Sequence, residues 1–187
     1  RDAQESRGLG DVYKRQACGM VKTVMIVGGQ RKNLPFFWLA EFPGTERGKM
    51  YCQINAGGLY GLQSYVAQVE VDISKGLPCF DMVGLLDSEV REARERLRVS
   101  LHHINAALPA EKITVNYSPA GIVKSGTSFD LPTALVILAA QGKVPPERLR
   151  ELWAVGEVGL DARIKQVRGV LAMLHAANQS AFRSYLI

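Results

Sequence analysis

The residues of this chain that are best suited to chemistry lie in a glycine-containing turn at positions 124–128, Lys-Ser-Gly-Thr-Ser. A serine in such a turn at the start of a helix, here Ser128, is a nucleophile when a histidine or a desolvated lysine lies within hydrogen-bond reach. The three histidines, His102, His103 and His175, fall on other predicted helices and identify no base. We therefore expect Ser128 to be a turn or capping hydroxyl, and a serine hydrolase remains the alternative.

The same turn nearly matches a phosphate-binding loop. Residues 121–128 fit the pattern GxxxxGK[ST] except that Thr127 stands in the lysine position. The lysine of that pattern supplies the positive charge on the terminal phosphates, which a threonine cannot do, and Lys124 lies too early in the loop to replace it. We expect a glycine turn that leads into a helix, with no cofactor bound; a nucleotide-binding module is a further alternative.

The turn is predicted to lie between a strand and a helix. Residues 112–117 alternate in polarity, and residues 131–141 are almost all apolar. The patterns also predict strands at 69–73, 79–83 and 152–158, a hairpin turn at 159–162 with a return strand at 163–167, and a helix at 169–178. A further helix is expected to start at Asp87 or Ser88 and to reach 104. Because strands and helices alternate, the predicted fold class is α/β (α+β), a mixed sheet packed by helices.

The helix expected after Asp87 carries a charged face of both signs, made of Arg91, Glu92, Arg94, Glu95, Arg96 and Arg98. Glutamate and arginine three or four residues apart stabilise a solvated helix, so a solvated face is the ordinary interpretation. The functional interpretation is a contact surface for a subunit or for nucleic acid through Arg91, Arg94 and Arg98. The net charge of +5 does not favour nucleic acid by itself, because residues 1–49 hold 9 basic and 5 acidic residues and the rest is nearly neutral.

Residues 1–49 differ in character from the rest of the chain. Residues 1–16 show no helical or strand period and resemble translated adapter sequence, and residues 17–49 hold one isolated apolar run at 24–27. We expect residues 1–49 to be a non-native or disordered leader, Met50 to be the natural start, and residues 50–187 to form the domain.

The cysteine pattern suits a protein of the reducing cytoplasm. Cys18, Cys52 and Cys79 are odd in number and lack CxxC spacing, which argues against a disulfide framework and against a zinc site. No metal site is expected, because no spacing of carboxylates sets one up. No apolar run is long enough to span a bilayer, so no membrane partner is expected.

Taken together, seven segments resemble the N-terminal domain of the YifB/ComM family of magnesium-chelatase-like AAA+ ATPases. They are VEVDISKGLP at 69–78, VGLLD at 83–87, RERLR at 94–98, ITVNYSPA at 113–120, KSGTSFDLP at 124–132, GEVGLD at 156–161 and VRGVL at 167–171. The resemblance implies the fold shared by a ribosomal small-subunit protein and the Lon protease catalytic domain, which contains a left-handed crossover. In that comparison Ser128 takes the place of the Lon nucleophile, and Leu171 takes the place of its lysine partner, so the catalytic dyad is expected to be missing.

The resemblance also implies what the parent protein does. The family's ATPase domain, with its own phosphate loop, is expected to follow this domain and to lie outside residues 1–187, so ATP and Mg²⁺ are expected for the parent only. Family members resemble ring-forming machines, and the competence branch is associated with DNA branch migration. The resemblance thus implies a non-catalytic accessory domain that supports ring assembly or DNA engagement in a homo-oligomer, and the alternative is a Lon-like serine peptidase that uses Ser128.

Overall fold

The sheet is built around a long antiparallel hairpin, β3 (Tyr51–Tyr60) and β4 (Gln63–Ser74). The computed structural model describes residues 23–27, 30–34, 51–61, 63–180, 182 and 184–187. In β4 the alternate residues Ala67, Val69, Val71 and Ile73 are buried, because successive side chains of a strand face opposite sides of the sheet. The alternation at residues 69–73 that predicted a strand is therefore the buried face of β4.

The remaining elements include three that the sequence did not predict, at residues 23–27, 30–34 and 146–149. In chain order, the remaining elements are β1 (Thr23–Val27), β2 (Gln30–Leu34), β5 (Cys79–Val83), α2 (Ser88–His103), β6 (Lys112–Ser118), α3 (Asp130–Ala140), α4 (Pro146–Leu149), β7 (Leu152–Ala154), β8 (Glu157–Val158), β9 (Ile164–Lys165), α5 (Val170–Asn178) and β10 (Ser184–Leu186). Asp87 caps α2, since its side-chain oxygen accepts a hydrogen bond from the backbone N–H of Val90 at 2.9 Å.

In the described part of the chain, the strands form an eight-stranded mixed sheet in the order β2-β1-β10-β7-β3-β4-β6-β5, and β8 pairs with β9 separately. The β10–β7, β7–β3 and β5–β6 pairs are parallel, and the other pairs are antiparallel. The expected fold class, a mixed sheet packed by helices, is confirmed.

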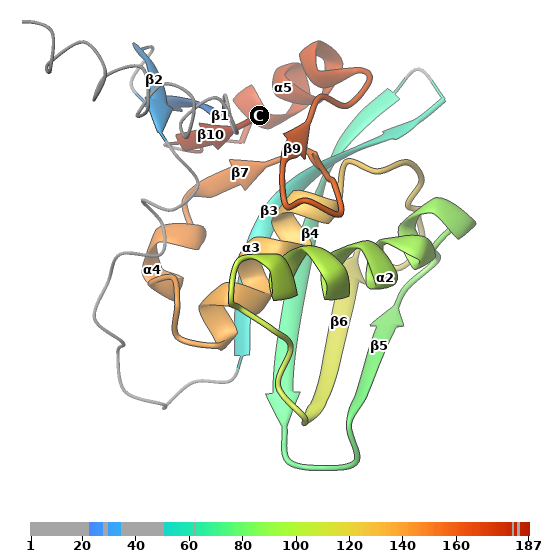
Figure 1. Ribbon diagram of the computed structural model, residues 1–187. Coiled ribbons are helices and arrows are strands. Elements are labelled where there is room, and N and C mark those ends of the chain that lie inside the picture. The colour runs from blue at the N-terminus through green and yellow to red at the C-terminus, as the bar shows by residue number, and fades with distance from the viewer. Residues whose placement is uncertain (1–22, 28–29, 35–50, 62, 181, 183) are drawn as a thin grey trace, which may run out of the picture.

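The β5–α2–β6 unit joins two neighbouring parallel strands. In Figure 1 both strands run upward, α2 lies in front of them, and the chain passes from β5 on the right to β6 on its left. This makes the crossover left-handed, against the strong right-handed preference of such units.

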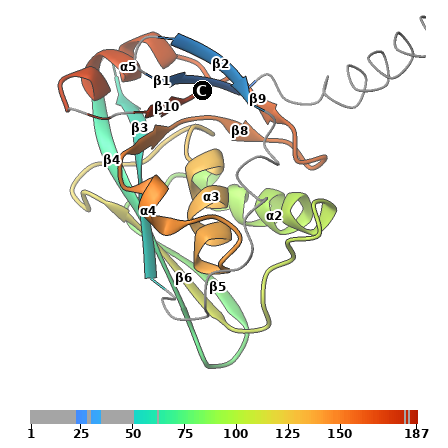
Figure 2. The ribbon, with the colours of Figure 1, turned by 90° about the vertical axis from the view of Figure 1, so that its left-hand side faces the viewer.

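The sheet has an apolar core on each face. The larger core joins alternate residues of β3, β4 and β6 to the inner faces of α2 and α3. The smaller core consists of Trp153, Val155, Met173 and Ala177 and packs α5 against the opposite face. Figure 2 shows this division, with α5 on one side of β7 and β10 and with α3 and α4 on the other.

Two details of the strands differ from the sequence prediction. The strand expected at 152–158 is interrupted, because the chain leaves the large sheet after β7 and forms β8 with a new partner. The sequence pattern missed β3, which contains Gly57 and Gly58. A Cβ at Gly57 would lie 2.4 Å from Cζ2 of Trp153, so the close packing of that indole requires glycine.

Most of the segment that we expected to be a leader, residues 1–22, 28–29 and 35–49, lies outside the described residues. In its described part, β1 and β2 form a hairpin, and β1 pairs with β10. These two strands extend the sheet beyond β10, while the domain boundary at Met50 stays a prediction.

Among the helices of the described residues, none combines the length and the hydropathy needed to cross a bilayer.

Candidate functional site

The glycine turn between β6 and α3 has the geometry that the sequence predicted. Gly126 has φ +80°, a left-handed conformation that glycine adopts without strain. The backbone N–H of Asp130 then donates to the carbonyl of Thr127 at 3.2 Å, and α3 begins. The turn therefore delivers Thr127 and Ser128 to the N-terminus of a buried helix.

Ser128 is held inside the domain. Its side chain is buried, with 3% of the residue exposed, and Oγ donates a hydrogen bond to the carbonyl of Gly57 at 3.0 Å. Its own carbonyl accepts the backbone N–H of Gly156 at 3.1 Å. Ser128 thus joins the start of α3 to β3 and to the segment between β7 and β8, and its hydroxyl proton is directed at a backbone oxygen.

Leu171, the residue in the expected position of a lysine partner, lies in a different environment. It is on the first turn of α5 and is 83% exposed. A side chain this exposed points into solvent and does not pack over a buried hydroxyl. The three histidines are also exposed, His102 and His103 at the end of α2 and His175 on α5.

Lys124 is fully buried, which the sequence pattern did not reveal. Its Nζ donates to the carbonyl of Ile122 at 2.9 Å and to the carbonyl of Pro119. Burial lowers the pKa of this amine from its ordinary value. The backbone of Lys124 also bonds to Leu85 and Asp87, so the residue ties the loop to the segment between β5 and α2.

This arrangement does not fit a phosphate group. The lysine of a phosphate loop must present its ammonium to the ligand, whereas Lys124 directs its ammonium at carbonyls of its own loop. Residues 121–128 therefore lack the free cation that a nucleotide site of this type needs.

The N-terminus of α3 carries the most strongly bonded charged pair of the site. Asp130 is buried, and its carboxylate accepts from Nε of Arg96 at 2.8 Å and from Nη2 at 3.1 Å. The backbone N–H of Val158 also donates to it at 3.3 Å. Burial raises the pKa of the Asp130 carboxyl, and the Arg96 guanidinium offsets part of that rise. The pair fastens α2 and β8 to the start of α3.

This pair corrects the expectation for Arg96. The sequence analysis placed Arg96 on the solvated face of the helix, but its side chain is 21% exposed and turns inward to Asp130. One signal could have indicated this contact: Asp130 is the one charged residue of an otherwise apolar helix, and buried carboxylates are normally paired.

A second polar contact joins the turn to the β8–β9 hairpin. Oγ1 of Thr127 donates to the Glu157 carboxylate at 2.9 Å, and Lys165 approaches the other oxygen of that carboxylate at 3.3 Å. The β8–β9 hairpin is thereby attached to the turn. Thr127 and Ser128 both have protein partners, so the contacts of the site are those of a structural junction.

The expected interaction surface on α2 is exposed. Arg91, Arg94 and Arg98 all face solvent, and Arg94 and Arg98 each approach Glu95, at 3.3 and 3.7 Å. Exposed pairs of this kind contribute little to stability, so these guanidinium groups can exchange Glu95 for another acidic partner.

The described residues contain no group of three or more His, Cys, Asp or Glu side chains that could hold a metal ion.

Comparisons with known proteins give the following matches. A family model described as subunit ChlI of Mg-chelatase matches residues 69–187. The competence protein ComM of Haemophilus influenzae is 38% identical over 120 residues, and the protein YifB of Escherichia coli is 39% identical over 120 residues. Each alignment covers 64% of this chain and 24% of the relative. An uncharacterized protein of Mycobacterium tuberculosis is 35% identical over 127 residues, which are 68% of this chain and 25% of that protein. The matched part of the chain thus spans about a quarter of the length of these relatives.

Proposed function

The chain belongs to the family of the ChlI subunit of Mg-chelatase, with YifB and ComM among its relatives, and on this premise we propose that residues 50–187 are a non-catalytic accessory domain of an AAA+ ATPase. In this proposal the domain has the Lon-protease-like fold, and it supports ring assembly or DNA engagement by a cytoplasmic homo-oligomer. ATP and Mg²⁺ act in the ATPase domain of the parent protein. The left-handed β5–α2–β6 crossover supports the proposed fold.

The observation that carries the non-catalytic role is the hydrogen bond from Ser128 to Gly57. A serine nucleophile must reach its substrate and pass its proton to a base. Here the hydroxyl is buried and donates to a backbone carbonyl, which cannot act as a base at neutral pH. Leu171 supports the same conclusion for two reasons. An aliphatic side chain has no atom that can accept a proton, and this side chain is exposed to solvent.

The peptidase alternative is tested with unfolded casein as the substrate. We expect the purified chain and its Ser128→Ala variant to release peptides at the same background rate. Thr133→Ser, which keeps a hydroxyl in the interior of α3, serves as a control for the quality of the preparation. Casein cleavage that the wild-type chain performs and Ser128→Ala abolishes would establish a Lon-like serine peptidase in place of the accessory role.

A nucleotide-binding module at residues 121–128 is tested by equilibrium dialysis of the chain against labelled ATP with Mg²⁺. Because Lys124 is engaged by carbonyl oxygens, we expect no retention at micromolar concentrations. Saturable micromolar retention that Lys124→Met removes would contradict the proposal.

The contact role is assigned to the exposed arginines of α2. The test is the double variant Arg94→Glu/Arg98→Glu in the full-length parent, because assembly and DNA binding belong to the whole protein. We expect a loss of oligomer in sedimentation or a loss of DNA affinity at fixed salt concentration. The matched control is Lys75→Glu/Arg168→Glu, which makes the same charge change on exposed residues outside α2. If both double variants behave like the wild type, α2 is not the contact surface.

A further inference from the structure

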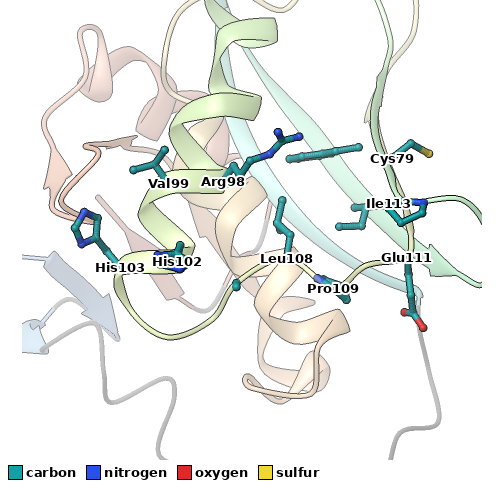
Figure 3. A pocket seen from close by; sticks show the side chains of 12 residues that line it. Cys79, Arg98, Val99, His102, His103, Leu108, Pro109, Glu111 and Ile113 are labelled. Atoms are coloured by element: carbon teal, nitrogen blue, oxygen red, sulfur yellow. The ribbon is translucent and has the colours of Figure 1, made fainter.

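A cavity of about 680 Å³ lies beside the C-terminal half of α2 (Figure 3). The start of β5, the start of β6 and the segment 107–111 complete its walls. Phe80 and Ile113 are buried and Leu108 is half-buried, so this part of the lining is apolar. Val99 adds an apolar side chain that is 41% exposed. The volume lies within the range of small-molecule sites, which are typically about 300–1,000 Å³.

Hydrogen-bond donors line the α2 side of this cavity. Arg98 comes from one turn of the helix and His102 and His103 from the next, and all three face solvent. In Figure 3 the Arg98 guanidinium extends from α2 toward the strands, above Leu108 and Ile113, whereas the Glu111 carboxylate and the Cys79 thiol point away. The positive group thus extends from α2 toward the side of the cavity that the strands form, and the acidic group of the lining is directed elsewhere.

Arg98 can bind a ligand in this position at low cost. Its described ionic contact is with Glu95 at 3.7 Å, and both side chains are more than half exposed. An exposed ion pair of this length contributes little, so the guanidinium can turn to a new anion. Arginine also presents several N–H donors in one plane, which suits a carboxylate, sulfonate or phosphate group.

We propose that this cavity binds a small amphipathic anion. The apolar body of the ligand lies against Phe80, Leu108 and Ile113, and its anionic head pairs with Arg98 near His102. This inference goes beyond the accessory role proposed above. It shares Arg98 with the contact surface proposed on α2, but probe binding to the isolated chain is measured without ring assembly or DNA, so the two proposals can fail separately.

The test uses two fluorescent probes that differ in charge. They are 8-anilinonaphthalene-1-sulfonate, an amphipathic anion, and N-phenyl-1-naphthylamine, which has the same ring systems without the sulfonate. Each probe is titrated into the full chain, and amide chemical-shift mapping locates the binding site. We expect saturable binding of the sulfonate with shifts confined to residues 78–80 and 98–113, and at least fivefold weaker binding of the neutral probe.

Matched variants distinguish probe binding in the cavity from nonspecific binding to other exposed apolar residues. Arg98→Gln should weaken the sulfonate at least fivefold and change the neutral probe less than twofold. Arg150→Gln removes the same charge from an exposed position outside the cavity and should leave both probes unchanged. Val99→Asp, at a partly exposed position, should weaken both probes at least fivefold.

Three outcomes would overturn the inference. They are equal binding of the charged and neutral probes, equal effects of Arg98→Gln and Arg150→Gln, and chemical-shift changes outside the cavity. The last outcome would identify exposed apolar residues elsewhere as the binding surface.

Discussion

We expect the substitution Asp130→Asn to lower the free energy of unfolding by about 2–3 kcal/mol. Breaking a buried ion pair by removing one partner costs about 3–5 kcal/mol, because the other charge is left uncompensated. Two features reduce that figure here. The Arg96 side chain is 21% exposed, so water can solvate it in part, and the asparagine oxygen can still accept the N–H of Val158.

Urea denaturation followed by circular dichroism measures this change. The matched control is Glu92→Gln, which removes an exposed partner of the same guanidinium at 3.9 Å and should change stability by less than about 0.5 kcal/mol. A double-mutant cycle of Asp130→Asn with Arg96→Met should give a coupling free energy of about 1–3 kcal/mol, since the two side chains share two hydrogen bonds. If Asp130→Asn changes stability no more than Glu92→Gln does, or if the coupling is near zero, the argument that this pair fastens α2 to α3 is wrong.

The other predictions concern the packing around the serine and the two described cysteines. Ser128→Ala should lower the free energy of unfolding by about 1–2 kcal/mol, because the Gly57 carbonyl loses a buried donor; an unchanged urea midpoint would argue against that bond. Gly57→Ala should cost about 1–3 kcal/mol by the same measurement, since its methyl group would collide with Trp153, and a neutral effect would contradict the close packing. Burial raises the pKa of the Cys52 thiol to about 11 from 9.0, so the stability that this group contributes below pH 9 should be lost as the pH rises from about 9 to 11. At pH 8, iodoacetamide followed by peptide mass spectrometry should modify Cys52 at least tenfold more slowly than the half-exposed Cys79, and comparable rates would show that Cys52 is accessible.

The regular part of the fold could be predicted because its patterns are local. The alternation of Val69, Val71 and Ile73 follows from one buried strand face, and the helical spacing of Val90, Leu97 and Leu101 follows from one buried helix face. The N-cap could be narrowed to two residues, and Asp87 is the one whose side chain accepts the hydrogen bond. These features depend on the nearest neighbours in sequence, so the sequence alone contains them.

The missed features depend on contacts between distant segments. β3 was missed because Gly57 and Gly58 weaken its pattern, and the reason for Gly57 is a tryptophan nearly a hundred residues later. The burial of Lys124 follows from how its own loop folds back, which no periodicity records. For the candidate site, the turn and the start of the helix near Ser128 were predicted, but its acceptor on β3 and the Arg96–Asp130 pair were not.

The division of the apolar residues between the two faces of the sheet has a consequence for local unfolding. α5 is held by the small cluster around Trp153 and Met173, whereas β4 and β6 are held by the larger one. Because segments open in cooperative units with separate free energies, α5 can detach while the hairpin and α3 remain folded. The amide protons of α5 should therefore exchange with deuterated water sooner than those of β4, through a partial opening that costs less than global unfolding.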